Sequence, residues 1–458
     1  MSPPSSSPPR AHEILDRLVV WGQKLGLERI RSVLADLGDP QLAVPCVLIA
    51  GTNGKGSTSS ALAAMLQASG YRTGLYNSPH LETVEERIRL QGRAIDSRTL
   101  GGLLERVVTT AERQNEDPPT YFEALTASAF LAFAEAPVDV AVMEVGLGGR
   151  LDATNVCEPV LSVISQIARD HQEHLGDTLA EIAVEKAGIL RRDRSCVSWL
   201  SPPESADAIR RCARQLDVDL VDATRGVEIR AEPRLELDAE GRFVGERQDV
   251  SLSTPAARYR FTTRLRGAHQ LDNLTLAVRS AEKLQSLGFE RLETKTMEEG
   301  LSRARWPGRM EWVCCETVDG PLRVLLDGAH NGAGARALAQ HVATLPLHFD
   351  LLFGALRRKN IDAVLPELAQ SAENVVLTAP PSDRAQDPAE LGALLDPNRF
   401  EVVVDCDRAL ERSLQLQNDR AESTALLVCG SLYLVGHVRE ALRRRFGVPE
   451  ATTEIVLG

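Results

Sequence analysis

Short apolar runs alternate with helical stretches along most of the chain. Apolar runs at residues 47–50, 138–145 and 159–167 predict buried strands, and the Ala- and Leu-rich segment 59–69 predicts a helix. Helical spacing of apolar residues over 11–38 predicts two short helices before the first strand. Polar residues or glycines follow each strand. We therefore expect a doubly wound, mostly parallel α/β sheet with its functional site at the carboxyl edge.

Residues 226–266 follow a different pattern, in which apolar and polar positions alternate and predict antiparallel strands. A helical stretch follows from Asn273 to about Leu287, and the α/β alternation then resumes in the last third of the chain. We expect one domain over 11–303, with a mostly parallel sheet plus a small antiparallel sheet. A smaller Rossmann-like α/β domain is expected over 304–458.

The composition of the chain limits which partners and which cellular compartment we expect. The chain has 458 residues, of which 43% are hydrophobic and 25% charged, as in soluble proteins with a full core. The net charge of -12 argues against a nucleic-acid or membrane partner, because such surfaces attract basic proteins. The eight cysteines show no C-x-x-C spacing, which favours reduced thiols and a cytoplasmic protein. The Pro- and Ser-rich residues 1–10 are expected to be a disordered leader.

A glycine-rich loop, Gly51–Thr58 (GTNGKGST), follows the first predicted strand and precedes a predicted helix. Glycines let backbone N–H groups converge on phosphate oxygens, and Lys55 would neutralise phosphate charge. The spacing is not the general one, because Ile49 stands where the first glycine should lie and Gly56 follows Lys55. A chance glycine-rich turn is the alternative, but the strand–loop–helix order favours a loop that binds ATP.

Candidate metal ligands follow other apolar runs. Glu144 ends a strand, where an unpaired carboxylate would be costly, while Ser78 and His171 follow two further apolar stretches. A carboxylate, an imidazole and a hydroxyl, completed by phosphates and water, could hold Mg²⁺. The alternative for His171 is a hydrogen-bonded structural histidine. Lys186 lies in a helical pattern, and its plainest interpretation is a lysine on a helix surface.

The loop resembles that of the Mur ligase superfamily, and its Lys-Gly-Ser ending resembles the folylpolyglutamate synthase branch, which includes bifunctional dihydrofolate synthases. The matching motifs occur in order from about residue 20 to residue 440. They are Ser78–Leu81, Thr120–Thr126, Glu144–Asn155, Asp170–His171 with Leu175–Thr178, Glu185–Ile189, His269–Gln270 with Asn273, Pro307–Arg309, Asp327–Asn331 and Gly430–Tyr433. The resemblance implies an N-terminal P-loop-containing Mur-ligase-type ATPase domain followed by a ligase C-terminal domain.

The resemblance also implies roles for individual residues. The catalytic residues would be Lys55, Glu144, His171 and Lys186. ATP would be bound by Asn53, Gly54, Lys55, Gly56, Ser57 and Thr58 of the loop, together with Asn273, Arg309, Asp327 and His330. Two Mg²⁺ ions are implied, held by Ser78, Glu144, His171 and a carbamylated Lys186. Asp327, at a strand end, could also be the N-cap of the following helix.

The pterin or folate would contact Thr120, Tyr121, Phe122, Glu123, Leu151, Asp152 and Ala153. Phe122 could stack on a flat pterin, and Asp152 could accept hydrogen bonds from its amino and ring N–H groups. The implied substrates are ATP, L-glutamate and either 7,8-dihydropteroate or a folate. In such ligases the γ-phosphate passes to a carboxylate, and an amine then displaces phosphate from the acyl phosphate.

Three alternatives remain open at this point. The enzyme could be a folylpolyglutamate synthase alone instead of bifunctional. A cell-wall precursor ligase would need a further N-terminal domain, for which the fifty residues before the loop leave no room. A P-loop ATPase or regulatory nucleotide-binding protein would turn over ATP without ligation. We expect a monomer without nucleic-acid or membrane partners.

Overall fold

The protein is described from a computed structural model, which covers residues 11–18, 26–114, 118–239, 241–317, 320–357, 361–418 and 424–446. The predicted leader, 1–10, lies outside these residues. The chain divides into two units, each described by itself below. The first unit comprises Met1–Arg230, Ser251–Phe261 and Asp272–Ala304, and the second comprises Ala231–Val250, Thr262–Leu271 and Arg305–Gly458.

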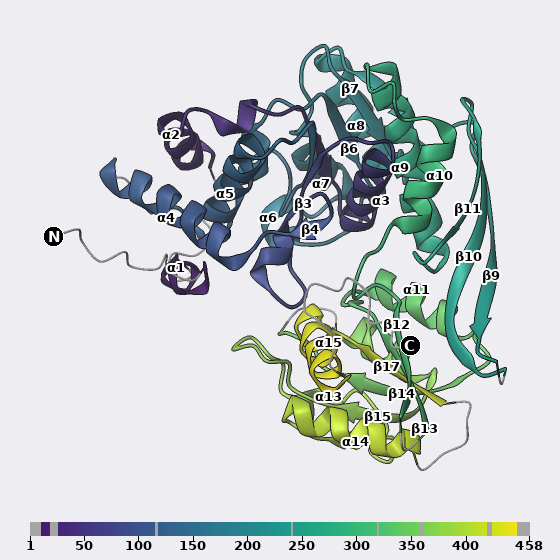
Figure 1. Cartoon of the computed structure of the whole chain (residues 1–458). Coiled ribbons are helices and arrows are strands. Elements are labelled where there is room, and N and C mark those ends of the chain that lie inside the picture. Colours follow the sequence, from purple (N-terminus) through teal and green to yellow (C-terminus); the bar gives the residue numbers. More distant parts are fainter. Residues whose placement is uncertain are drawn as a thin grey trace. The chain divides into compact units, whose positions relative to one another are not determined.

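An eight-stranded sheet forms the centre of the first unit (Figure 1). The strand order is β4-β3-β2-β5-β1-β6-β7-β8. Neighbours from β2 to β8 pair in parallel, while β3 and β4 add antiparallel at one edge. The strands are β1 (Cys46–Ala50), β2 (Thr73–Tyr76), β3 (Ile88–Leu90), β4 (Arg93–Ala94), β5 (Val140–Glu144), β6 (Leu161–Ile164), β7 (Ser195–Ser198) and β8 (Asp219–Asp222). The three predicted strands, β1, β5 and β6, and the mostly parallel sheet are confirmed.

The register of the central strands sets where their loops begin. All residues of β1, β5 and β6 are buried, as expected for parallel strands covered on both faces. Ile49 pairs with Glu144 of β5, and Ala50 pairs with Ile164 of β6. The loops that follow these three strands therefore leave the sheet at the same level, at its carboxyl edge.

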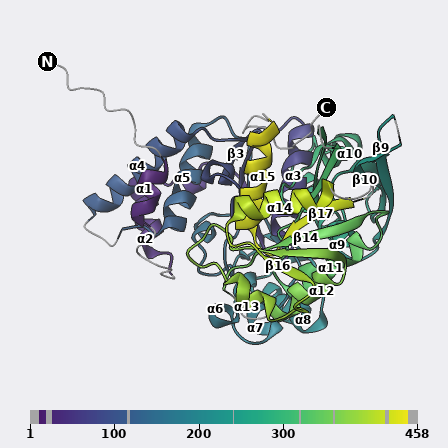
Figure 2. The same cartoon turned by 90° about the horizontal axis from the view of Figure 1, so that it is seen from below.

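Helices cover the sheet. One hydrophobic core joins Leu48 and Met143 to residues of α1, α2, α4, α5, α7 and α8, while α3 packs against α10 (Figures 1 and 2). The helices are α1 (Ala11–Leu18), α2 (Glu28–Asp36), α3 (Lys55–Ala68), α4 (Ser97–Arg113), α5 (Tyr121–Glu135), α6 (Gln172–Leu175), α7 (Leu179–Ala187), α8 (Pro203–Gln215), α9 (Ala268–Ser286) and α10 (Thr294–Arg303). Short 3-10 turns lie at Pro40–Leu42, Val84–Arg87 and Ala153–Val156.

Two of these helices begin earlier than the sequence pattern predicts. α3 starts at Lys55, inside the glycine loop, and α9 starts at Ala268 instead of Asn273. In both cases the first turn consists of small or polar residues without apolar periodicity, so the pattern does not reveal it. The two short helices expected in 11–38 are present as α1 and α2, with residues 19–25 outside the described part.

A separate three-stranded sheet, in the order β11-β10-β9, contains β9 (Glu228–Leu237), β10 (Phe243–Ser253) and β11 (Arg258–Thr263). Asp238 N–H donates to the carbonyl oxygen of Arg242 between the first two strands, and Thr254 N–H donates to that of Ala257 between the last two. Short turns of this kind join antiparallel neighbours. The prediction of antiparallel strands over 226–266 is confirmed.

The last third of the chain forms a six-stranded sheet in the order β12-β13-β17-β14-β15-β16, which lies in the second unit. β12 is antiparallel to β13, and the other pairs are parallel. The strands are β12 (Glu311–Thr317), β13 (Gly320–Leu326), β14 (His348–Phe353), β15 (Ala372–Leu377), β16 (Phe400–Val402) and β17 (Thr424–Cys429). The helices are α11 (Gly332–Val342), α12 (Leu365–Ala369), α13 (Pro388–Gly392), α14 (Cys406–Asn418) and α15 (Leu432–Phe446), with a 3-10 turn at Ile361–Ala363. The predicted return of α/β alternation is confirmed.

Across the described ranges, we find no helix with the length and apolar character that a membrane crossing requires.

Close packing of α10 on α3 predicts opposite effects for two helical glycines. A Cβ at Gly300 would lie 2.4 Å from the Cα of Met65, whereas a Cβ at Gly102 in α4 would meet nothing within 4 Å. We expect Gly300→Ala to lower the free energy of unfolding by about 1–3 kcal/mol through overpacking. Gly102→Ala should raise it by roughly 0.5–1 kcal/mol, because alanine restricts the unfolded chain. Urea unfolding of both variants checks this, and equal effects would contradict it.

Candidate active site

The glycine loop lies between β1 and α3, with backbone that only glycine tolerates at two points. Gly54 has φ +84°, and its Cβ would lie 2.0 Å from Oδ1 of Asn273. Gly51 has φ +148°, and its Cβ would lie 1.8 Å from Oγ of Ser165. The loop is thus pressed against β6 on one side and against Asn273 on the other. The structure brings Asn273 to the loop, as the sequence predicts.

The residues after β6 hold this loop. The N–H groups of Thr52 and Asn53 donate to the carbonyl oxygen of Gln166, at 2.8 and 3.4 Å. The hydroxyl of Ser165 donates to the carbonyl oxygen of Asn53 at 2.7 Å. The side chain of Gln166 also donates to Asp272 at 2.6 Å. The sequence analysis missed these supporting residues, although a Ser-Gln pair at the end of an apolar run was an available signal.

The first turn of α3 carries the other predicted phosphate ligands. Gly56, Ser57 and Thr58 are buried there. The hydroxyl oxygen of Thr58 is fully buried and has no hydrogen-bond partner among the described residues. Buried hydroxyls normally have partners, and a bound phosphate or a metal-bound water would supply one.

Two lysines converge on one carbonyl oxygen of the loop. Nζ of Lys55 donates to the carbonyl oxygens of Gly51 and Thr52, at 2.9 and 3.1 Å, and Nζ of Lys186 donates to that of Gly51 at 2.8 Å. Lys186 is only 4% exposed, so the alternative of a surface lysine is wrong. Burial first, and the charge of Lys55 second, lower the pKa of Lys186 to about 7. A buried lysine of this kind is largely deprotonated above neutral pH and can react as a neutral amine.

Glu144 and Ser78 meet at the ends of neighbouring strands. Glu144 ends β5 and is 4% exposed, and its Oε2 accepts a hydrogen bond of 3.4 Å from the N–H of Ser78. His171 is the N-cap of α6 and has a left-handed backbone, φ +50°, and its side chain is 42% exposed. Its Nε2 lies 3.9 Å from Oδ1 of Asp170.

These residues fit a metal that is completed by a bound nucleotide. Within the described ranges, no group of three or more His, Cys, Asp or Glu side chains is arranged to hold a metal. The predicted set contains only two side chains of these types, Glu144 and His171. Mg²⁺ commonly takes one or two carboxylates and fills its remaining positions with phosphates and water. A buried carboxylate at the sheet edge beside a phosphate loop suits this mode.

A second loop, 145–153, leaves β5 next to the phosphate loop and contains Leu151, Asp152 and Ala153. Asp152 is buried, and it accepts hydrogen bonds from the N–H of Leu147 at 2.8 Å and of Thr154 at 3.0 Å. Burial raises the pKa of this carboxyl group despite these bonds. A Cβ at Gly146 would lie 2.5 Å from the ring of Phe122 and 3.2 Å from Oδ2 of Asp152. The structure therefore brings the predicted aromatic and acidic groups together.

The start of α5 gives Glu123 a local role. Thr120 and Glu123 form a capping box, in which each side chain accepts from the other residue's N–H group. The carboxylate of Glu123 also accepts from Arg29 at 3.0–3.2 Å, and its side chain is 5% exposed. Glu123 thus fixes the start of the helix that carries Tyr121 and Phe122. The sequence analysis missed Arg29, whose partner lies 94 positions away.

A further polar group lies beside this helix. Nε of Arg87 donates to Nδ1 of His80 at 2.9 Å, and its guanidinium carbon lies 5.4 Å from the centre of the Tyr121 ring. Burial, then the charge of Arg87, lower the pKa of His80 to about 3. His80 is therefore a neutral imidazole whose Nε2 carries the proton. Neither residue was predicted as a site residue.

The second unit brings its three predicted residues together at the end of β13. The carboxylate of Asp327 accepts from the N–H of Met310 at 2.9 Å and of Ala329 at 2.7 Å. Nη1 of Arg309 lies so close that a Cβ at Gly328 would be 2.1 Å from it. Nδ1 of His330 lies 2.7 Å from the carbonyl oxygen of Gly328.

Asp327 does not cap the following helix. The N-cap of α11 is Asn331, whose Oδ1 accepts a hydrogen bond of 2.9 Å from the N–H of Gly334. That alternative interpretation of Asp327 is wrong, because the helix starts only at Gly332 and its N-cap is Asn331.

Comparison with known proteins identifies the family. The Mur ligase middle domain matches residues 49–281, and the Mur ligase glutamate ligase domain matches residues 308–432. The Bacillus subtilis dihydrofolate synthase/folylpolyglutamate synthase is 33% identical over 436 residues, which cover 92% of this chain and 96% of the relative. The chain belongs to the Mur ligase family, in the branch of dihydrofolate synthases and folylpolyglutamate synthases. Members of this family are ATP-dependent ligases, and the predicted resemblance is confirmed.

This Mur ligase spans about half the length of some relatives. A probable bifunctional folylpolyglutamate synthase/dihydropteroate synthase of Haloferax volcanii is 36% identical over 430 residues, which cover 92% of this chain and 49% of that protein.

Solved structures share the fold over nearly the whole Mur ligase chain. Mycobacterium tuberculosis folylpolyglutamate synthase, complexed with ADP and AMPPCP, matches with a TM-score of 0.82 and 31% identity, covering 94% of this chain and 98% of that one. Escherichia coli FolC, in complex with DHPP and ADP, matches with a TM-score of 0.80 and 28% identity, covering 97% and 100%. A bifunctional folylpolyglutamate synthase/dihydrofolate synthase with Mn, AMPPNP and L-glutamate bound matches with a TM-score of 0.78 and 28% identity, covering 97% and 100%. The predicted fold class is confirmed.

The lowered pKa of Lys186 predicts how stability depends on pH. The folded protein releases this proton near pH 7, whereas the unfolded chain holds it up to its ordinary value of 10.5. Between these values the unfolded chain binds more protons, so this group makes stability rise with pH. We expect Lys186→Met to lose that rise when urea unfolding is compared at about pH 6.5 and about pH 9 in metal-free, CO₂-free buffer.

The control for this comparison is Lys295→Met, which replaces an exposed lysine of α10. The stability of Lys295→Met should depend on pH as the stability of the wild type does. A Lys186→Met protein whose stability changes with pH as the wild type does would contradict the lowered pKa.

Proposed function

We propose that this Mur ligase uses ATP to join L-glutamate to 7,8-dihydropteroate, forming dihydrofolate, and to tetrahydrofolates, extending a polyglutamate chain. The proposal is supported by the relative named dihydrofolate synthase/folylpolyglutamate synthase and by the solved relatives that hold ADP, DHPP, Mn or L-glutamate. A folylpolyglutamate synthase without the first activity is the alternative within the same family.

One observation carries the proposal further than the family name. The phosphate loop and the loop with Asp152 follow β1 and β5, which pair in parallel with Ile49 opposite Glu144. Gly146 packs tightly between Phe122 and Asp152. A flat ring that stacks on Phe122 would therefore lie one strand away from the phosphates. This arrangement suits transfer of a phosphoryl group to an acid attached to such a ring.

The proposed residue roles are those that the family resemblance implies. Lys55, Asn53 and the first turn of α3 would bind the triphosphate, with Asn273 from α9 and with Arg309, Asp327 and His330 of the second unit. Glu144, His171, Ser78 and a carbamylated Lys186 would hold Mg²⁺. The metal, when bound, would reduce the repulsion between the phosphate and the carboxylate. The pterin would contact Thr120, Tyr121, Phe122, Glu123, Leu151, Asp152 and Ala153.

The chemistry takes two steps. A carboxylate oxygen attacks the γ-phosphorus, and the bond from that phosphorus to the β,γ-bridging oxygen breaks, releasing ADP. The glutamate amine then attacks the acyl carbon, phosphate leaves, and the amine loses a proton. Lys55 would stabilise the negative charge of the first step, and buried groups around Asp152 would keep water from the acyl phosphate.

We further propose a cytoplasmic monomer whose ATP- and pterin-binding domain spans 11–303 and whose ligase C-terminal domain spans 304–458. Cys46, Cys157, Cys196, Cys212, Cys314, Cys406 and Cys429 are free thiols, which suits a reducing compartment.

Substrate dependence tests the proposed reaction. We expect phosphate release to require ATP, L-glutamate and either dihydropteroate or tetrahydrofolate together, with the ligated product seen by mass spectrometry. Lys55→Ala should lower kcat by about 100-fold or more, because it removes a charge aimed at the transferred phosphate. The control Lys295→Ala changes an exposed lysine and should leave kcat unaltered. ATP turnover that is indifferent to the pterin and glutamate would mean an ATPase without ligation.

Chemical rescue tests the carbamate. Lys186→Ala removes the amine that would react with CO₂, and we expect its loss of activity to be partly restored by a small carboxylate such as acetate, measured as initial rate against acetate concentration. Acetate should not restore Lys55→Ala, whose role is cationic. Full activity of Lys186→Ala without acetate would refute the role.

A further inference from the structure

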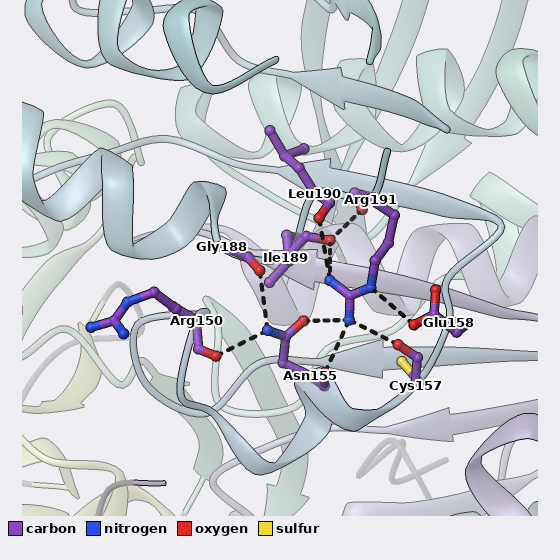
Figure 3. A network of polar contacts seen from close by, with 9 residues as sticks. Arg150, Asn155, Cys157, Glu158, Gly188, Ile189, Leu190 and Arg191 are labelled. Carbon is purple, nitrogen blue, oxygen red and sulfur yellow. Dashed lines mark hydrogen bonds and ion pairs between the residues drawn. The ribbon is translucent and has the colours of Figure 1, made fainter. Parts of the chain in front are cut away.

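A partly buried arginine joins the two segments that carry Asp152 and Lys186. Arg191 lies just beyond the end of α7, and its side chain is 19% exposed. No motif of the sequence analysis included it, and the reaction proposed above gives it no direct part. Figure 3 shows its guanidinium surrounded by main-chain oxygens from two stretches of chain.

Most of these contacts are to the loop after Asp152. Nη2 of Arg191 donates to the carbonyl oxygens of Asn155 and Cys157, at 3.0 and 2.9 Å, and to Oδ1 of Asn155 at 2.9 Å. Nη1 donates to the carbonyl oxygens of Ile189 and Leu190, at 3.2 and 3.3 Å. Nε lies 3.4 Å from Glu158, whose side chain is exposed. The two terminal nitrogens thus bond different segments.

Asn155 completes the connection from the other side. Its Nδ2 donates to the carbonyl oxygens of Arg150 and Gly188, at 3.0 and 3.1 Å (Figure 3). Its own N–H donates to the carbonyl oxygen of Asp152 at 2.8 Å. One amide and one guanidinium therefore satisfy carbonyl groups on both the loop and the end of α7.

The loop that bears Asp152 also packs closely against the end of α7. A Cβ at Gly149 would lie 2.7 Å from the carbonyl oxygen of Glu185 and 2.9 Å from that of Lys186. A Cβ at Gly188 would lie 2.4 Å from Cβ of Arg150. The N–H of Arg150 donates to the carbonyl oxygen of Glu185 at 2.9 Å. Displacing the loop would therefore displace the last turn of α7.

We propose that Arg191 is a positioning residue, which fixes the loop bearing Asp152 to the helix end bearing Lys186 so that pterin and phosphate sites keep one geometry. The expected loss of activity rests on the proposed function, whereas the fixing of the loop to the helix end does not. Arginine suits the task because its planar guanidinium offers five donors in fixed directions, whereas a lysine ammonium is a point charge with three. The neighbouring Arg192 cannot substitute, because its side chain is 61% exposed and pairs with Asp217 at 3.3 Å.

Three variants of the full chain test this: Arg191→Gln, Arg191→Lys and the control Arg192→Gln. We expect kcat/KM for dihydropteroate to fall by about 10- to 100-fold in Arg191→Gln, since small misplacements cost rates of this order. The KM for ATP should change by less than about twofold, because the phosphate loop has its own supports on β6. Arg191→Lys should recover part of the loss, and Arg192→Gln should match the wild type.

Hydrogen exchange followed by mass spectrometry separates this inference from the proposed reaction. In ligand-free protein, Arg191→Gln should speed exchange in both 146–157 and 185–190 and leave β13 and β17 unchanged. If the wild type performs no ligation, this result still decides the structural claim. Faster exchange in only one of these two segments would overturn the proposed positioning role. An Arg191→Gln protein with a lower melting temperature but wild-type kinetics for dihydropteroate and ATP would also overturn it. If Arg191→Gln does not fold, the kinetics and the hydrogen exchange of Arg191→Lys decide between these outcomes.

Discussion

The parallel pairing of β1 with β5 on one side and β6 on the other is the constraint on which the site of the first unit depends. Its register sets Ile49 beside Glu144 and Ala50 beside Ile164. Three loops that are far apart in the sequence therefore begin at the same level. The phosphate loop can then rest on the residues after β6, and the pterin-side loop begins one strand away. A slip of register would separate all of these groups at once.

The cations at this edge are satisfied by main-chain oxygens. Lys55 and Lys186 both bond to the carbonyl of Gly51. A carbonyl dipole completes a hydrogen bond but does not cancel a charge. Lys55 therefore keeps a charge that suits phosphate. Burial first, and the nearby charge of Lys55 second, lower the pKa of Lys186.

The sequence predicted β1, β5, β6 and the loop well, because buried parallel strands are continuous apolar runs and a phosphate loop needs glycine at set points. The sequence pattern did not reveal the contacts between residues that are far apart in the chain. Nothing near Glu123 indicates Arg29, and nothing near Asn155 indicates that Arg191 would fill the space beside it. The start of α9 at Ala268 was missed because a polar first turn has no apolar period. Lys186 shows the same limit, since its burial depends on packing against the phosphate loop and not on its own helix.

The pairing of Arg29 with Glu123 has a consequence for the order of folding. The capping box between Thr120 and Glu123 spans four residues and can close within an isolated helix turn. The arginine that neutralises Glu123 lies 94 positions earlier, so its contact requires closure of a long loop. Glu123 can therefore become buried as a charged group only after α2 has docked. The helix that carries Phe122 therefore acquires its final environment only when α2 packs against it.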